Sequence, residues 1–498
     1  MSEAIAPKVK IDRWQWIVLL TVIVGTFLGR LDQTIVNLAM PKIMDDFGIT
    51  ISAAGWIGTA YIIANAIFVP IWGKLGDLLG RKKIYIIGFS IFILGSVLCG
   101  FAWNLSSMII FRIIQAIASS ADYPTAMAII AVTFHDGKQR AQALGVWSAS
   151  FMAASVFGPL IGGPLIDNFG WPAVFFINLP IGIAGVIMAI LFIHESRDSN
   201  LKMRFDWLGA VLLGGALSSL VLVLEKGLSW GWTSVSSLIC YLLIVTLFAG
   251  FIYQEKRAPD PMIDLKFFKI PVFNNALVNN FVVFMGMIGA VFLVPLFAQN
   301  FLGYDATQTG LLFMPMAFVM MIAAPIGGSL VGKVKPNKVI FFSSLVAAIG
   351  IYLFTFLEAK SGPLAIIIPV MVMAGGMGFG MAQRTNLVSS AVPVREVGSA
   401  SAVLALVRNI AGAFGIAIFS TILDTATKNH AMDLIRYSSI QVFDQATVAK
   451  YGYLIFMQAQ ILAFRTVFFW GAVVVFIGAI LSWWIKVKKE VKNDSVME

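Results

Sequence analysis

Charge is scarce in this chain. Charged residues make up 12% of its 498 residues, while 59% are hydrophobic. Because a soluble protein carries about 25% charged residues, too little charge is present to cover a surface facing water. The two cysteines, Cys99 and Cys240, lie inside apolar stretches and have the spacing of neither a disulfide framework nor a metal site. These deficits exclude a soluble globular protein and indicate a chain that lies in a lipid bilayer.

Groups that carry enzyme chemistry are also few. The three histidines, His135, His194 and His430, lie in loops or at the ends of apolar stretches, without a partner at ligand spacing. No phosphate-binding loop, nucleotide-binding pattern or catalytic triad is visible. We therefore expect no enzyme activity, no cofactor and no bound metal. The net charge of +10 comes from short basic clusters between apolar stretches, so we expect no nucleic-acid partner.

What the sequence does contain is a series of long apolar stretches. About 20 apolar residues cross a bilayer as a helix, whereas a membrane β-barrel would show short alternating segments. We count fourteen continuous stretches and predict an all-α polytopic membrane protein with 14 transmembrane helices. To within a few residues they cover 14–38, 52–72, 84–103, 106–131, 141–166, 172–193, 207–224, 234–253, 272–299, 307–331, 337–357, 363–388, 397–423 and 462–485.

The distribution of Lys and Arg predicts an orientation, because cytoplasmic loops of membrane proteins are enriched in these residues. When the N-terminus is taken as cytoplasmic, most of the 35 Lys and Arg residues fall in cytoplasmic segments. We therefore predict that both termini face the cytoplasm and that the protein lies in the plasma or inner membrane. The longest loop, about 425–462, would then be extracellular, and its sequence is compatible with a helix or a hairpin.

A glycine-rich basic turn follows the second stretch. Its defining residues are Gly73, Gly76, Asp77, Gly80 and Arg81. Glycines let helix ends approach closely, and a carboxylate at this place can accept hydrogen bonds from a helix N-terminus or pair with the arginine. An ordinary basic turn at the membrane surface is the simpler alternative. The pattern resembles the loop signature of the major facilitator superfamily, and residues 328–335 echo it in the second half of the chain.

The fifth stretch contains a second pattern, made of Gly158, Pro159, Gly162 and Gly163. Proline kinks a helix and glycine allows close backbone contact, features that a plain packing helix would also use. The pattern resembles the antiporter motif of exporters in the superfamily. Further segments are similar to its drug:proton antiporters with fourteen spans, namely residues 31–41, 171–180, 205–209, 375–380 and 408–412.

This resemblance implies a major facilitator fold, with two six-helix halves and two inserted transmembrane helices. The N-terminal bundle would comprise residues 14–193, the inserted helices with their linkers 194–271, and the C-terminal bundle 272–485. Cytoplasmic tails would cover residues 1–13 and 486–498. The resemblance also implies that the first helix of each three-helix repeat lines a central cavity, which selects the first, fourth, ninth and twelfth stretches.

Charged residues deep in these stretches are functional candidates, because a charge in a membrane is costly. Asp32 and Arg112 lie at similar depth by residue count, and so do Asp122 and Arg384. We predict the ion pairs Asp32–Arg112 and Asp122–Arg384, with both acids in proton coupling and Arg112 tuning one of them. Purely structural salt bridges are the alternative. Arg408 falls outside the cavity helices, where a structural role fits equally well.

The first stretch presents a conflict between Arg30 and Asp32. They lie two residues apart, about 200° around a helix, so both cannot face the cavity. Arg30 shares a polar face with Gln33, Thr34 and Asn37. Either Asp32 points at the fourth stretch or another neighbour, or Arg30 lines the cavity. The resemblance favours Asp32 for coupling.

Amides, aromatic rings and thioethers suit a pocket for amphiphilic ligands. Helix packing explains any single one of these residues equally well. The candidates for the substrate cavity are Arg30, Asn37, Tyr61, Asn65, Gln115, Asn279, Asn280, Phe284, Met287, Gln383 and Arg384.

Without a nucleotide-binding site, the energy for transport would come from an ion gradient, where one charge crossing 100 mV releases roughly 2.3 kcal/mol. We predict a secondary active transporter that exports small amphiphilic organic compounds in exchange for protons by alternating access. Its partners would be the substrate, protons and the bilayer, and the sequence leaves a periplasmic adaptor protein open. An importer or exporter of an organic anion that uses the intramembrane arginines is the alternative, and a non-transporting scaffold or sensor is the remote one.

Overall fold

The computed structural model describes residues 12–49, 51–196, 205–304, 306–393, 396–436 and 445–485, which contain helices and no strand. The predicted tails at 1–13 and 486–498 lie almost wholly outside these residues. The helices are α1 (Arg13–Phe47), α2 (Ile51–Leu79), α3 (Arg81–Gly100), α4 (Leu105–Ser119), α5 (Asp122–Thr133), α6 (Gly137–Phe169), α7 (Ala173–Phe176), α8 (Asn178–Phe192), α9 (Trp207–Trp230), α10 (Val235–Arg257), α11 (Pro271–Leu302), α12 (Ala306–Ser329), α13 (Pro336–Leu353), α14 (Leu364–Ser390), α15 (Val397–Arg436) and α16 (Gln445–Leu481).

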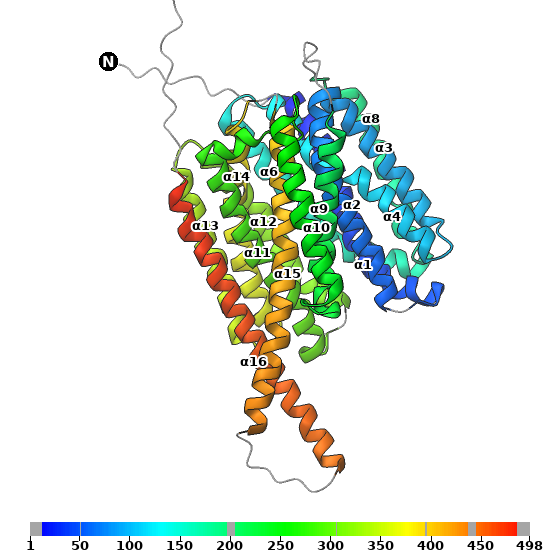
Figure 1. The fold of residues 1–498 in the computed structure, drawn as a ribbon, viewed down its shortest axis with the longest axis vertical. Helices are drawn as coiled ribbons and strands as arrows, with labels where there is room; N and C mark the ends of the chain where they lie inside the picture. Colours follow the sequence, from blue (N-terminus) through cyan, green and yellow to red (C-terminus); the bar gives the residue numbers. More distant parts are fainter. Residues whose placement is uncertain are drawn as a thin grey trace, which may run out of the picture.

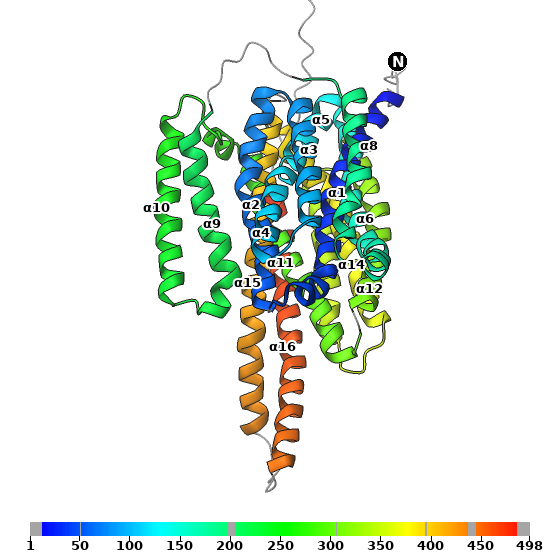
Figure 2. The ribbon, with the colours of Figure 1, turned by 90° about the vertical axis from the view of Figure 1, so that its right-hand side faces the viewer.

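The helices account for the predicted membrane spans. Within the described ranges, 13 helices are long and apolar enough to cross a bilayer, with α4 and α5 together forming one of them. The 33-residue helix α6 packs between α1 and α12 as a further long helix of the bundle (Figure 2). Each of the fourteen predicted stretches therefore falls on a helix of this bundle, and the predicted all-α membrane fold is confirmed.

The helices form two groups and a separate pair. One large cluster of buried apolar side chains is built almost entirely from residues 18–193, and a second from residues 283–475. Helices α9 and α10 stand at one edge as a pair, with α9 packed against α2 and α15 (Figure 2). We refer below to residues 13–193 as the N-half, to residues 271–485 as the C-half, and to the end of the bundle where α1 begins as the N-end.

The fourth predicted span is not one continuous helix. Helix α4 begins at an Asn104 cap and ends at Ser119, and α5 starts anew at Asp122. Ser120 and Ala121 form a short turn between the two helices. Asp122 is therefore the first residue of a new helix rather than a residue inside a continuous one.

The segment predicted as a long external loop is mostly helical. Helix α15 continues to Arg436, and α16 begins at Gln445. Both helices extend well beyond the rest of the bundle at the end away from the start of α1 (Figure 1). The sequence allowed a hairpin at this place, and the described residues form its two arms.

Candidate functional site

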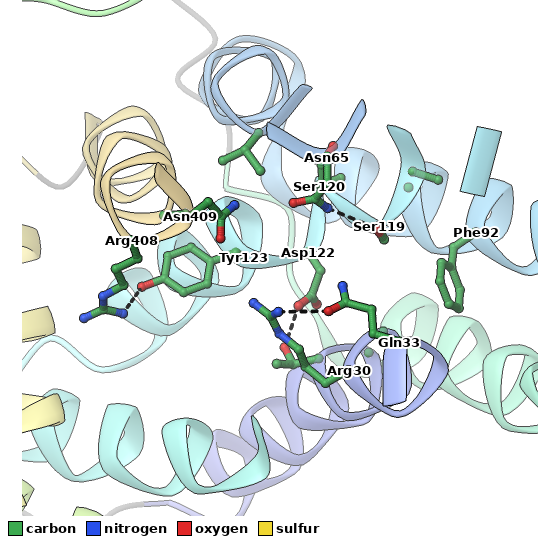
Figure 3. Close-up of a pocket in the computed structure, with 18 of the residues that line it drawn as sticks. Arg30, Gln33, Asn65, Phe92, Ser119, Ser120, Asp122, Tyr123, Arg408 and Asn409 are labelled. Atoms are coloured by element: carbon green, nitrogen blue, oxygen red, sulfur yellow. Dashed lines mark hydrogen bonds between the residues drawn. The ribbon is translucent and has the colours of Figure 1, made fainter. Parts of the chain in front are cut away.

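A cavity of about 300 Å³ lies between the two halves. Helices α1 to α5 contribute to its wall from the N-half, and α11, α14 and α15 contribute from the C-half (Figure 3). Its volume is at the lower end of the range for ligand pockets. The polar residues in its wall are Thr26, Arg30, Gln33, Thr34, Asn65, Tyr85, Ser119, Ser120, Asp122, Tyr123, Arg408 and Asn409.

Asp122 is the acid in this wall, and the start of α5 carries it. Thr26 donates a hydrogen bond of 2.8 Å to one of its carboxyl oxygens, and the Trp147 indole donates one of 2.9 Å to the Thr26 hydroxyl. The other carboxyl oxygen is buried without a hydrogen-bond partner. The Arg30 guanidinium lies beside Asp122 and attracts it electrostatically (Figure 3). Asp122 thus combines burial, one neutral donor and one cation, an arrangement that a proton can alter.

Arg30, not Asp32, lines the cavity from α1. Arg30 donates a hydrogen bond of 3.2 Å to Gln33, which also lies in the wall. Asp32 points to the opposite side of α1, as the spacing of the two residues requires. The structure therefore places Asp32 against α4 and α8, which was one of the two arrangements that the sequence left open.

The predicted pairing of Asp32 with Arg112 is confirmed, at 2.7 Å. Asp32 is fully buried and also accepts hydrogen bonds from Gln115 at 2.9 Å and from Asn178 at 2.8 Å. The Arg112 guanidinium lies over the Tyr61 ring, 4.2 Å from its centre. None of these five residues belongs to the described wall of the cavity. They form a closed cluster of paired charges inside the N-half.

The predicted pairing of Asp122 with Arg384 is wrong. Arg384 donates its hydrogen bonds to Asn279 at 3.1 Å and to Ser343 and Ser344, all in the C-half. The prediction counted only depth along the fourth span, whereas the Asp122 side chain lies against α1, where it accepts a hydrogen bond from Thr26. Arg384 is 1% exposed and lies outside the described cavity wall.

Arg408 is a cavity residue that the sequence analysis placed outside the cavity. It donates hydrogen bonds to Tyr123 at 2.8 Å, to Asn280 at 3.1 Å and to Thr385 at 2.9 Å. Its guanidinium also lies over the Phe284 ring, 4.7 Å from the centre. The bond to Tyr123 joins α15 of the C-half to α5 of the N-half, next to Asp122 (Figure 3). An arginine in an apolar stretch was the one signal that could have identified it.

The remaining cavity candidates divide into two groups. Asn65, Phe284 and Met287 line the cavity together with Arg30. The others are absent from the described wall. Tyr61, Gln115, Asn279, Asn280 and Gln383 are buried behind it, and Asn37 is exposed. They do not line this cavity in the conformation described, because a helix position gives depth but not the rotation of the helix toward its neighbours, and their role in binding substrate stays a prediction.

The glycine-rich turn joins the halves at the N-end. Asp77 pairs with Arg81 at 3.3 Å and accepts hydrogen bonds from the backbone N–H and hydroxyl of Ser399, at 3.0 and 2.8 Å. Ser399 lies in the first turn of α15, where partial positive charge favours a carboxylate. A methyl group at Gly73 would lie 2.7 Å from Ala402 Cβ, so glycine is needed for this close approach of α2 and α15.

Two other glycines of the turn have different surroundings. Gly80 has a φ of 107°, which side-chain-bearing residues rarely adopt, and it starts α3. Gly76 faces Thr125 of α5 at ordinary contact distance. The turn therefore holds α2, α3, α5 and α15 together at the N-end.

The second pattern lies on α6, which contacts both α1 and α12. Gly158 faces Thr34 and Gly162 faces Ile35 of α1, whereas Gly163 has open space beside it. The helix continues through Pro159. Nearer the N-end, a methyl group at Gly145 would lie 2.7 Å from the Ala324 carbonyl oxygen of α12. Helix α6 is thus packed closely against both halves.

These contacts join the two halves on the N-end side of the cavity. The α2–α15 and α6–α12 pairs meet there, and Arg140 donates a further hydrogen bond across the halves to Asn386, at 3.4 Å. In the described residues no group of three or more His, Cys, Asp or Glu side chains is arranged to hold a metal ion. The arrangement is that of a cavity between two helical bundles that contact each other closely at the N-end.

Comparisons with known proteins agree with this architecture. The family model of the Major Facilitator Superfamily matches residues 22–416. The multidrug transporter protein MdtP of Bacillus subtilis is 35% identical over 412 residues, which is 82% of this chain and 76% of that protein. The multidrug export protein EmrB of Escherichia coli is 29% identical, over 86% of this chain and 84% of its own length.

A solved structure shows the same fold. The human organic anion transporter MFSD10 (TETRAN) superposes with a TM-score of 0.67 at 13% identity, covering 94% of this chain and 99% of that one. The family model spans most of this chain, and the relatives are named as transporters rather than enzymes. The chain therefore belongs to the Major Facilitator Superfamily, as its loop signature predicts.

Proposed function

We propose that this protein exports small amphiphilic organic compounds across the cell membrane in exchange for protons. The names of MdtP and EmrB, which describe multidrug transport, support the export of such compounds. The cavity between the halves supplies a binding site of suitable size. The single observation that carries the proposal is Asp122, an acid in the wall of this cavity beside Arg30.

Asp122 can couple proton binding to conformation through its neighbours. When Asp122 is ionised, it holds Arg30 electrostatically, and a proton on the carboxylate removes that attraction. The next residue, Tyr123, accepts the hydrogen bond from Arg408 that links the halves. A change of charge at Asp122 therefore occurs next to the Arg408–Tyr123 hydrogen bond, which must break when the two halves move relative to each other. Asp32 is the second candidate, but it lies in a cluster whose charges are paired.

The orientation follows from the predicted topology. If both termini face the cytoplasm, the contacts at the N-end close the cytoplasmic side of the cavity. Opening of those contacts would expose the cavity to the cytoplasm, where the compound to be exported binds. The relatives' names do not favour the predicted alternative, transport of an organic anion. The periplasmic adaptor protein stays a prediction.

The test is transport by the purified protein in lipid vesicles with an imposed pH gradient. We expect a panel of fluorescent amphiphiles to be moved against the direction of proton flow. Asp122→Asn should abolish the dependence on the gradient while binding persists. Asp167→Asn changes an exposed carboxylate at the end of α6 in the same way and is the matched control. Gradient-driven transport that is unchanged in Asp122→Asn, with loss only in Asp32→Asn, would move the coupling role to Asp32.

A further inference from the structure

The cavity wall is divided by chemistry. The five side chains that α11 and α14 contribute are all apolar, namely Phe284, Met287, Ile288, Met377 and Met381. All the polar side chains come from residues 13–133 and from α15, although α2 and α3 also contribute Val69, Phe89 and Phe92. Flexible thioethers and an aromatic ring accommodate apolar bodies of different shape. A ligand that fills this space therefore needs one apolar side and one polar side.

Two asparagines in the cavity wall have side-chain amide groups that can form hydrogen bonds with a ligand. Asn65 on α2 donates one N–H to Ser119 at 3.1 Å, and no other hydrogen bond of its amide is present among the described residues. Asn409 on α15 makes no side-chain hydrogen bond within the same part of the chain. Both are partly exposed, one in each half, and both lie around the space beside Asp122 and Tyr123 (Figure 3). Neutral amides can donate to a ligand and accept from it.

The charges of the wall disfavour a charged ligand of either sign. Arg30 and Arg408 outnumber Asp122 among the described lining residues, so a cationic ligand would add to an excess of positive charge. An anion would have to compete with groups that these guanidinium side chains already bind. Arg408 donates through Nε, Nη1 and Nη2 to three neighbours, and Arg30 donates to Gln33 and attracts Asp122.

We propose that Asn65 and Asn409 are specificity-determining residues that bind the polar end of an uncharged amphiphile, such as one bearing hydroxyl, ketone or amide groups. The apolar body of this ligand lies against the methionines and Phe284. This inference rests on the proposed function, because it names the class of compound that the same cavity takes. Since the two amides belong to different halves, a ligand that forms hydrogen bonds with both also links the N-half to the C-half.

The test uses three compounds with one aromatic scaffold and one size, ending in a primary amide, a carboxylate or a quaternary ammonium group. Binding to the purified protein is measured by fluorescence titration without any gradient, so the result does not depend on proton coupling. We expect the amide compound to bind most tightly. Asn65→Ala and Asn409→Ala should each weaken its binding roughly threefold to tenfold, the range for one lost hydrogen bond.

A variant that changes which ligand charge the cavity prefers makes the test sharper. Asn409→Asp keeps the shape of the side chain and balances the excess positive charge, so it should weaken the amide compound and strengthen the quaternary ammonium compound. Asn168→Asp, an exposed position at the end of α6, is the matched control and should change neither. Tightest binding of the ammonium or the carboxylate compound to the unmodified protein would overturn the inference, and so would an Asn409→Asp variant with unaltered preference. Binding as expected without gradient-driven transport would instead count against the proposed function alone.

Discussion

Arg112→Met should destabilise the N-half strongly, because it leaves Asp32 as an uncompensated charge inside the protein. Arg112 donates to Asp32 at 2.7 Å and to Gln115 at 2.6 Å, and it is 3% exposed. Removing one partner of a buried ion pair typically costs about 3–5 kcal/mol. Asn178 and Gln115 still donate to Asp32 after the change, so we expect a loss of about 3 kcal/mol, at the lower end of that range.

The double variant Asp32→Asn/Arg112→Met removes both charges and leaves a neutral acceptor for Gln115 and Asn178. It should recover about 2 kcal/mol relative to Arg112→Met, since no buried charge then lacks a partner. The measurement is equilibrium unfolding of the purified protein in mixed micelles of a mild detergent and dodecyl sulfate. Arg465→Met, which breaks an exposed pair with Glu358, is the matched control and should cost less than about 1 kcal/mol.

The same variants separate a structural role of Asp32 from a coupling role. If the cluster only holds α1, α4 and α8 together, the double variant should keep proton-driven transport per folded molecule. A double variant that is no more stable than Arg112→Met would refute the energetic pairing of the two residues. A stable double variant without gradient-driven transport would show that Asp32 takes part in coupling.

Three further predictions concern the contacts between the halves, each read from distances between spin labels on α2 and α15 at the N-end. Asp77→Asn weakens the bonds from Ser399 and should increase the population that is open at this end. Tyr123→Phe removes the acceptor of Arg408, at a cost of about 1.5–3 kcal/mol to the closed form, and should act in the same direction. Gly145→Val places a branched side chain against α12 and should also separate the halves, whereas unchanged distances in all three variants would contradict the assigned closure.

The fold could be predicted because a bilayer restricts what a chain can do. Long apolar stretches must become helices, since backbone groups find no partner in hydrocarbon. The fourteen stretches therefore located the helices, and the turn at Gly73–Arg81 indicated the superfamily. The break between α4 and α5 left no comparable trace, because Ser120 and Ala121 are compatible with a continuous helix.

The partner of a buried charged residue could be predicted only where the depth of that residue in the membrane was enough to identify it. Asp32 of α1 and Arg112 of α4 lie at one level of the bundle, and their long side chains meet. The Asp122–Arg384 prediction used the same argument and failed, since depth does not show which neighbour a side chain faces: Asp122 faces α1, and Arg384 bonds to residues of α11 and α13. Arg408 was missed for a related reason, because a family pattern of cavity helices does not reveal which face of α15 meets α5.

The placement of the charges suggests why two acids in one bundle should differ in function. Asp32 has an ion-pair partner and two neutral donors, so proton binding there would have to displace a complete set of bonds. Asp122 has one donor and a carboxyl oxygen without a partner, beside a cavity. Less is lost when a proton binds to Asp122, and the neighbouring Tyr123 carries a contact between the halves. We therefore expect Asp122, which has fewer hydrogen-bond partners than Asp32, to be the acid that exchanges protons during transport.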